Sequence, residues 1–257
     1  MHFSYDKKLP SGEIIRVKKP RQGYLRANIT YECDLKCPNC NRACDMAISS
    51  PKENMTIEQF KEVLDDAKKL NIKIWNKILL TGGEPSKHPD LFKFCEELVK
   101  FKKDFHHNVS LFLCTYQPSN TKCMVEEIFK TFPEIELQGV QKTQKRKHKI
   151  ATYMAPIDLS EKEPPFYRGC HHGAGLCGQT VDYKGFYPCP TAPAIARTFD
   201  IDCAVKKLKD VSLHSLTDCY DSVCKFCGYY NMTRARGSEV KMSKSWQDAI
   251  QKYNKKN

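Results

Sequence analysis

Short apolar segments alternate with longer amphipathic segments between residues 24 and 138, and this alternation restricts the fold more than any other feature of the chain. Strands are expected over residues 24–30, 77–80, 110–115 and 135–138. Helices are expected after Pro89, over residues 123–132 and after Thr56, where Thr56-Ile57-Glu58-Gln59 fits a capping box. Alternating strands and helices favour parallel strands joined by right-handed crossovers. The sequence therefore predicts an α/β fold whose site lies where the carboxyl ends of the strands meet.

The 14 cysteines of this 257-residue chain are interpreted through the compartment in which it is kept. The N-terminus lacks the apolar segment of a signal peptide, and no stretch of about 18 apolar residues is present to span a membrane. Thiols in the cytoplasm stay reduced, so clustered cysteines there are expected to bind metal. We therefore predict a cytoplasmic metal-binding protein with no membrane partner. The isolated Cys95, Cys114 and Cys123 are expected to be small core residues.

The first cysteine cluster directly follows the first expected strand. Cys33, Cys37 and Cys40 lie within eight residues, so three thiolates can surround one compact metal centre. A [4Fe–4S] cluster normally takes four cysteines, and three leave one iron open for chemistry. Cys44 supplies the alternative, because a fourth thiolate would close a zinc site or saturate the cluster.

A glycine-rich segment, Thr81-Gly82-Gly83-Glu84-Pro85, ends the second expected strand and favours the open iron–sulfur site. Together with the cysteine loop, it resembles the radical S-adenosylmethionine (SAM) superfamily over roughly residues 23–140. The resemblance implies a partial (β/α)6 TIM-type barrel. The implied ligands of the SAM-binding [4Fe–4S] cluster are Cys33, Cys37 and Cys40, and the implied SAM-binding residues are Gly82, Gly83 and Glu84. Glycine lets the backbone approach the SAM amino group, which a Cβ would obstruct.

A second cysteine-rich region follows residue 165. A hairpin is expected over residues 179–188, with Lys184-Gly185 near its turn. A hairpin with cysteines at its base and a distant Cys-x2-Cys suits a four-thiolate centre. The region resembles the auxiliary-cluster extensions of radical SAM enzymes, the twitch form with one cluster and the SPASM form with two. By that resemblance, one auxiliary [4Fe–4S] cluster is bound by Cys170, Cys189, Cys224 and Cys227.

Alternatives stay open in this region. Cys177 can replace Cys170, Cys219 can replace a later cysteine, and Cys203 is left over. A zinc ribbon built from the same thiols is the alternative metal site. The expected organisation is an N-terminal extension (1–22), a radical SAM partial barrel (23–165) and a small cysteine-rich auxiliary-cluster domain (166–257).

The resemblance implies an enzyme that reductively cleaves SAM to a 5′-deoxyadenosyl radical, which then abstracts a hydrogen atom from the substrate. An auxiliary cluster suggests that the substrate radical gives up an electron. We therefore expect a net oxidation, either a dehydrogenation or a crosslink, of a small molecule or a peptide. A reductant such as flavodoxin or ferredoxin is the implied protein partner.

The net charge is +12, from 42 basic and 30 acidic residues. This excess favours anionic partners, so modification of a nucleic acid or nucleotide is the alternative within the enzyme class. The simpler interpretation is a solvated lysine-rich surface. A zinc- and nucleic-acid-binding module and an electron-transfer protein that leaves SAM intact are the alternatives from other classes.

Overall fold

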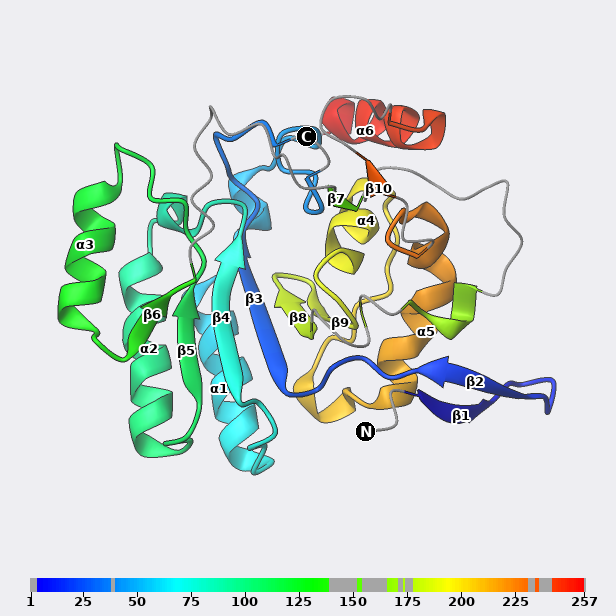
Figure 1. Cartoon of the computed structure of the whole chain (residues 1–257), viewed down its shortest axis with the longest axis horizontal. Coiled ribbons are helices and arrows are strands. Elements are labelled where there is room, and N and C mark those ends of the chain that lie inside the picture. Colours follow the sequence, from blue (N-terminus) through cyan, green and yellow to red (C-terminus); the bar gives the residue numbers. More distant parts are fainter. Residues whose placement is uncertain are drawn as a thin grey trace.

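A six-stranded sheet organises the part of the chain that the computed structural model describes, which is residues 4–37, 40–138, 152–153, 166–170, 173, 178–230, 234–235 and 242–256. The strand order is β6-β5-β4-β3-β8-β9 (Figure 1). The strands are β3 (Tyr24–Thr30), β4 (Lys77–Gly82), β5 (Ser110–Leu113), β6 (Ile135–Leu137), β8 (Gln179–Asp182) and β9 (Gly185–Tyr187). Neighbouring strands are parallel except β8 and β9, which form the expected antiparallel hairpin.

Three helices flank the parallel strands on the left of Figure 1: α1 (Ile57–Lys69), α2 (Leu91–Asp104) and α3 (Lys122–Thr131). The capping box of α1 forms as its sequence predicts, because Gln59 N–H donates to Thr56 Oγ1 (3.2 Å) and Thr56 N–H donates to Gln59 Oε1 (2.9 Å). Strand and helix alternate along this half of the chain, so the prediction of an α/β fold with a mostly parallel sheet is confirmed. The arrangement is consistent with a partial barrel.

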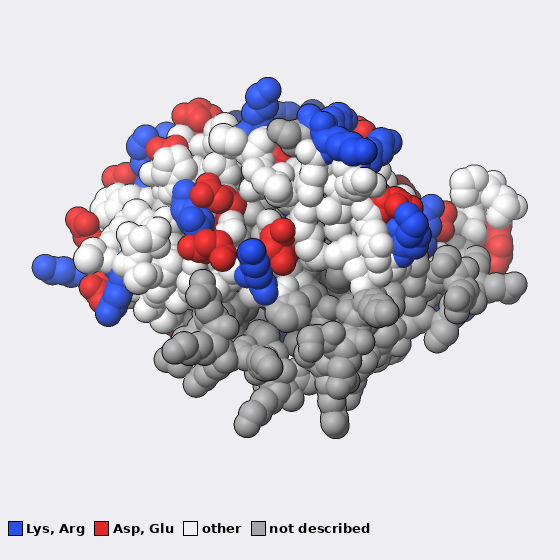
Figure 2. Space-filling model, turned by 90° about the horizontal axis from the view of Figure 1, so that it is seen from above, with Lys and Arg blue, Asp and Glu red and all other residues white. Residues whose placement is uncertain are grey.

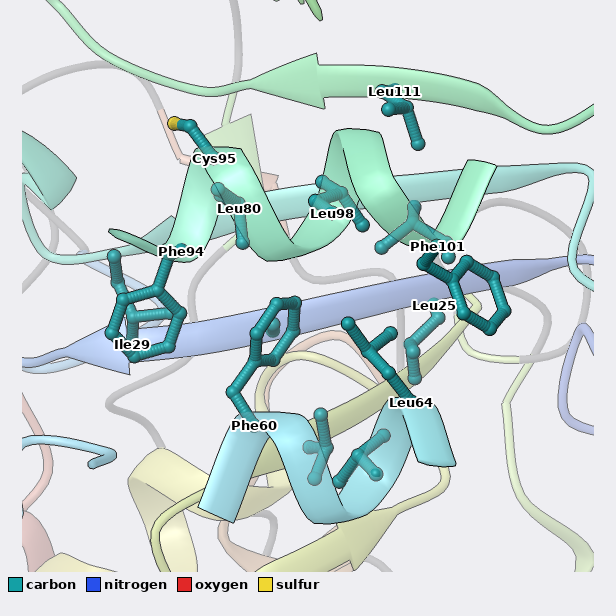
Figure 3. Packing of buried hydrophobic residues seen from close by; sticks show 14 of the residues in the cluster. Leu25, Ile29, Phe60, Leu64, Leu80, Phe94, Cys95, Leu98, Phe101 and Leu111 are labelled. Atoms are coloured by element: carbon teal, nitrogen blue, oxygen red, sulfur yellow. The ribbon is translucent and has the colours of Figure 1, made fainter. Parts of the chain in front are cut away.

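The main hydrophobic core lies between the sheet and these helices (Figure 3). Leu25 and Ile29 of β3 pack beneath α1 and α2 and are fully buried. The rings of Phe60 on α1 and Phe94 on α2 are 5.0 Å apart between centroids. Burying a Leu, Ile or Phe side chain contributes about 1.5–3 kcal/mol. These buried side chains together therefore hold both helices against β3, the strand that leads to the first cysteines.

The later part of the chain adds α4 (Ala192–Thr198), α5 (Leu213–Val223) and α6 (Lys244–Lys256) on the right of Figure 1. Shorter elements are the pair β7 (Thr152–Tyr153) and β10 (Arg234–Ala235) and the 3-10 helices η1 (Pro51–Glu53), η2 (Pro85–Lys87), η3 (Phe166–Arg168), η5 (Leu208–Asp210) and η6 (Cys224–Phe226). A second hydrophobic cluster joins these helices to residues 43–47 of the cysteine loop.

The N-terminal residues form a hairpin, β1 (Ser4–Lys8) with β2 (Ile14–Lys18), which the sequence did not predict. Val17 is fully buried in the second cluster. Tyr220 Oη of α5 donates to the Lys18 carbonyl (3.1 Å), so the hairpin packs on the C-terminal part of the chain. The predicted domain boundaries at residues 22 and 166 remain predictions.

The three isolated cysteines differ in their surroundings. Cys95 is fully buried in the core, as expected, but Cys123 is exposed and Cys114 is only partly buried, so the prediction is wrong for these two. Helix α3 turns Val125 and Ile128 toward the core, which leaves Cys123 outside. None of the helices in the described part of the chain is both long and apolar enough to cross a membrane.

A buried polar contact joins the carboxyl end of β3 to β8. Tyr31 Oη donates to Asp182 Oδ2 (2.8 Å), and Lys184 N–H donates to Asp182 Oδ1 (2.8 Å). Burial is the main cause that raises the pKa of Asp182 to about 6. Because the folded state favours the protonated carboxyl, ionisation costs stability as the pH rises from about 4 to about 6.

Asp182→Asn removes the ionisation, keeps an oxygen that accepts from Lys184 N–H, and places an NH2 group that can donate to Tyr31 Oη. The variant is therefore expected to gain about 1–3 kcal/mol over the wild type as the pH rises from about 4 to about 7. Urea unfolding across this range measures the difference. Asp200→Asn serves as the control and should show no such gain, because Lys256 lowers the pKa of Asp200. Wild-type and Asp182→Asn curves that ran parallel with pH would contradict the prediction.

Candidate functional site

A cavity of about 320 Å³ lies at the carboxyl ends of β3, β4, β5 and β6, where a site was predicted. The thiol-bearing residues that line it are Cys33, Cys37, Cys40, Cys44 and Cys114. The glycine-rich segment lines it as well, through Thr81, Gly82, Gly83 and Glu84. The structure thus brings the two sequence motifs together, because β3 and β4 are adjacent parallel strands that end side by side.

The glycine-rich segment is hydrogen-bonded to the residues just before the first cysteine. Gly83 N–H donates to the Thr30 carbonyl and Glu84 N–H donates to the Glu32 carbonyl, and the N···O distance is 2.8 Å in both hydrogen bonds. A Cβ on Gly82 would lie 2.1 Å from Thr30 O, and a Cβ on Gly83 would lie 2.3 Å from Glu32 O. Both glycines are therefore required by the close approach of two backbones, a reason the sequence alone did not reveal.

The side chain of Glu84 stabilises the cavity wall through hydrogen bonds. Its carboxylate is buried and accepts hydrogen bonds from Ser86 N–H (3.1 Å), from Tyr116 N–H (3.1 Å) and from the Thr115 hydroxyl. These bonds tie the loop after β5 to the end of β4. Sequence reasoning missed Thr115 and Tyr116, although their position at the carboxyl end of the third expected strand was a usable signal.

The cysteines of the loop differ in their electrostatic surroundings. A hydrogen bond between Cys40 and Cys44 lowers the pKa of Cys40 to about 5 and raises that of Cys44. Burial is the main cause that raises the pKa of Cys33 to about 11. Cys44 lies in the same cavity as the three predicted ligands, so the structure places all four thiols within one site.

The donor set of this cavity fits an iron–sulfur cluster, which is held by cysteine thiolates. Three or more thiols line one cavity large enough for a small ligand, and the adjoining wall has backbone in place of side chains at Gly82 and Gly83. Among the described residues, no group of three or more His, Cys, Asp or Glu side chains is arranged to hold a single metal ion.

A second group of thiols gathers where η3, β9 and η6 meet. Burial raises the pKa of Cys224 and Cys227, and the charges of Cys170 and Cys189 raise both further. Gly173 N–H donates to Cys170 Sγ, with an N···S distance of 3.3 Å. A Cβ on Gly173 would lie 3.5 Å from Cys189 Cβ and 3.8 Å from Cys170 Sγ, so the four cysteines predicted to share one centre lie close together.

Two of the remaining cysteines form a separate pair. The sulfur atoms of Cys203 and Cys219 are 2.7 Å apart, so Cys219 contacts Cys203 directly. The hydrogen bond with Cys203 and burial raise the pKa of Cys219, and the charges of Cys224 and Cys189 raise it further, so the pair borders the second thiol group. The alternative ligand Cys177 lies outside the described residues.

A buried arginine supports the cysteine loop from behind. Arg197 of α4 forms a 2.7 Å ion pair with Glu53, and the two side chains are 1% and 8% exposed. Its other amino group donates to the carbonyls of Ala47 (2.7 Å) and Ala43 (3.4 Å). Tyr253 of α6 accepts a further hydrogen bond from Arg197 (2.7 Å). Helices α4 and α6 are thereby joined to the segment that follows Cys40.

Gly83→Ala tests the close approach at the glycine-rich segment. The new Cβ must displace the Glu32 carbonyl, so we expect a loss of about 1–3 kcal/mol of unfolding free energy and a lower iron content after oxygen-free reconstitution. Urea unfolding and iron analysis measure these effects. Gly23→Ala is the matched control, because its Cβ would meet only the Asn76 side chain at 3.2 Å. Equal behaviour of the two variants would refute the steric argument.

Arg197→Met tests the support behind the loop. It leaves Glu53 buried without its partner and is expected to lower the unfolding free energy by about 3–5 kcal/mol. Adding Glu53→Gln should restore part of this loss, because the neutral side chain no longer needs a counter-charge. Lys206→Met, which removes the exposed pair with Asp202, should cost less than about 1 kcal/mol. Additive losses in the double variant would show that the buried pair is not coupled.

A family model and three curated relatives are similar to part of this chain. A model of the radical SAM superfamily matches residues 27–159. The GTP 3′,8-cyclase of Campylobacter lari is 29% identical over 85 residues, which are 32% of this chain and 24% of the relative. That of Desulforamulus reducens is 31% identical over 75 residues (29% and 22%), and a probable GTP 3′,8-cyclase of Pyrococcus horikoshii is 32% identical over 80 residues (31% and 24%). The chain thus spans about a quarter of the length of these curated relatives.

Two solved structures show weaker similarity. Streptococcus suis SuiB bound to the precursor peptide SuiA is 18% identical, with a TM-score of 0.35 over 47% of this chain and 24% of SuiB. BtrN in an open conformation is 10% identical, with a TM-score of 0.43 over 85% of this chain and 92% of BtrN. The superfamily match includes both sequence motifs of the cavity and covers more than half of the 257 residues. The chain belongs to the radical SAM superfamily.

Proposed function

We propose that this enzyme reductively cleaves SAM in the cavity at the carboxyl ends of β3 to β6, with Cys33, Cys37 and Cys40 as the ligands of the SAM-binding [4Fe–4S] cluster. The observation that carries the proposal is the common cavity of these three thiols and the Gly82-Gly83 backbone. The group bound there would supply one electron to SAM and so generate a 5′-deoxyadenosyl radical that abstracts hydrogen from the substrate.

The chain's own residues would hold SAM and keep the cavity in shape. The N–H groups of Gly83 and Glu84 already donate to the β3 end, so the carbonyl oxygens of the segment are the groups suited to accept hydrogen bonds from the SAM amino group. The Glu84 carboxylate accepts three hydrogen bonds from its own chain. We therefore assign Glu84 to positioning of the SAM site by its side chain, with any SAM contact made by its backbone.

We further propose that Cys170, Cys189, Cys224 and Cys227 bind one auxiliary [4Fe–4S] cluster in a cysteine-rich domain over residues 166–257. The mutual proximity of the four thiols supports this assignment. The contact between Cys219 and Cys203 favours leaving both out of the ligand set. A second redox centre in the same chain suits a net oxidation of the substrate, and a flavodoxin or ferredoxin would deliver the first electron.

The substrate of this oxidation is proposed to be a small molecule or a peptide. A nucleotide is the second candidate, and the observation that favours it is the name shared by three relatives, GTP 3′,8-cyclase. Deuterium transfer into 5′-deoxyadenosine from labelled candidates distinguishes them, because only the hydrogen donor of the reaction passes its label.

Cysteine variants test the ligand assignment in oxygen-free, reconstituted protein. Cys33→Ala, Cys37→Ala and Cys40→Ala are each expected to abolish formation of 5′-deoxyadenosine from SAM with dithionite as reductant, because fewer than three thiolates remain. Cys44→Ala is the matched control from the same cavity and should retain SAM cleavage. Loss of activity in Cys44→Ala together with an intact cluster in Cys33→Ala would overturn the assignment.

The auxiliary centre is tested separately by Cys224→Ala and Cys227→Ala. Each variant should lose about half of the bound iron while the SAM-binding cluster keeps its spectroscopic signal. Cys203→Ala, which removes a thiol outside the proposed ligand set, should keep the full iron content. A colourless protein that binds zinc in place of iron would favour the zinc-module alternative.

A further inference from the structure

A second cavity, of about 370 Å³, lies on the outer side of the cysteine loop and is distinct from the proposed radical site. It is formed by segments that are distant in sequence: η1, the turn between β8 and β9, the end of α4 and one side of α6. Its cationic lining residues are Lys52, Lys184, Arg197, Lys252 and Lys256. Neither the superfamily motifs nor the proposed chemistry assigns this cavity a role.

The charges around this cavity do not balance. Five cationic side chains face two carboxylates, Glu53 and Asp200, which leaves a formal excess of three positive charges. Glu53 is already paired with Arg197 and Asp200 with Lys256 (3.1 Å). Among the described residues, Lys52 and Lys252 take part in no ion pair. Figure 2 shows that basic side chains gather at the upper edge of the face that is drawn.

Three of the cavity's lysines lie close enough to Asp200 to lower its pKa. A hydrogen bond from Lys256 lowers the pKa of Asp200, and the charges of Lys184 and Lys252 lower it further. Three lysines from two separate elements therefore converge near a single carboxylate. Asp200 offsets one of these three charges, and a bound anion would offset the others and reduce the repulsion between the lysines.

The rest of the wall is suited to the organic part of a ligand. Tyr183, Phe199 and Tyr253 contribute aromatic surface. Lys184 Nζ is 5.7 Å from the centroid of the Tyr183 ring. The volume lies within the range of about 300–1,000 Å³ that is typical of small-molecule pockets.

We propose that this cavity binds a phosphate-bearing small molecule, with the phosphate groups held by Lys184, Lys252 and Lys52. The excess of three positive charges matches the charge of a diphosphate, and the aromatic wall accommodates an attached organic group. A small molecule fits better than a nucleic acid, because the cations surround a defined cavity instead of following an extended groove.

A ligand here would contact the support of the cysteine loop. Arg197 and Tyr253 form part of the cavity wall, and Arg197 also donates to the carbonyls of Ala43 and Ala47. The buried Arg197 thus lines this cavity and also donates hydrogen bonds to the loop that follows the first thiols. The binding inference itself is independent of the radical chemistry, because none of its residues is a proposed iron ligand.

Calorimetric titration of inorganic pyrophosphate and of ADP into the reconstituted protein tests the proposal. Lys184→Gln combined with Lys252→Gln should weaken binding of both probes about tenfold, since each exposed cation contributes a modest amount. The matched control is Lys209→Gln combined with Lys255→Gln, which removes the same charge from exposed lysines outside the cavity and should weaken binding by less than about twofold. Thermal unfolding of both double variants verifies that they fold.

Specific outcomes overturn the proposal. Absence of binding of both probes at millimolar concentration, or equal weakening in the two double variants, would show a diffuse basic surface instead of a site. Tight binding of a single-stranded RNA that displaces pyrophosphate would assign the cavity to a nucleic acid. Cys33→Ala separates this proposal from the radical mechanism, because that variant should lose SAM cleavage and keep its affinity for pyrophosphate.

Discussion

The architecture of the site depends on one close approach of two backbones. The end of β4 lies so near the end of β3 that carbonyl oxygens occupy the space where side chains of Gly82 and Gly83 would begin. Two hydrogen bonds of 2.8 Å fix this contact directly before Cys33. The position of the first thiol is thereby set by main-chain geometry, which side-chain motion cannot easily disturb. The parallel pairing of β3 with β4 extends this order from the core to the cavity.

A buried ion pair completes the site from the opposite side. Arg197 and Glu53 are nearly inaccessible to solvent, and a buried pair of this kind is costly to break because the remaining charge loses its partner. Through Arg197, the segment after Cys40 is held by helices from the C-terminal part of the chain. Both hydrophobic clusters therefore position the walls of the thiol-lined cavity, although every thiol in it comes from the first half of the sequence.

Local signals predicted much of this structure. The capping box at Thr56 and the apolar periodicity gave α1, and the position of both motifs at strand ends gave the cavity. Long-range contacts left no such signal. Arg197 lies in a short alanine-rich helix, and its role exists only once Glu53 is brought beside it. At Cys123 a local signal was misleading. Its apolar neighbours predicted burial, but the orientation of α3 leaves it exposed.

The separation of these partners along the chain has a consequence for biosynthesis. Arg197 lies 144 positions after Glu53, and Tyr253 lies 200 positions after it. While the polypeptide is being translated, the cysteine loop leaves the ribosome long before the groups that secure it. A nascent chain thus displays its first thiols on an unsecured loop, and delivery of iron to a finished site must wait until α6 has emerged and docked.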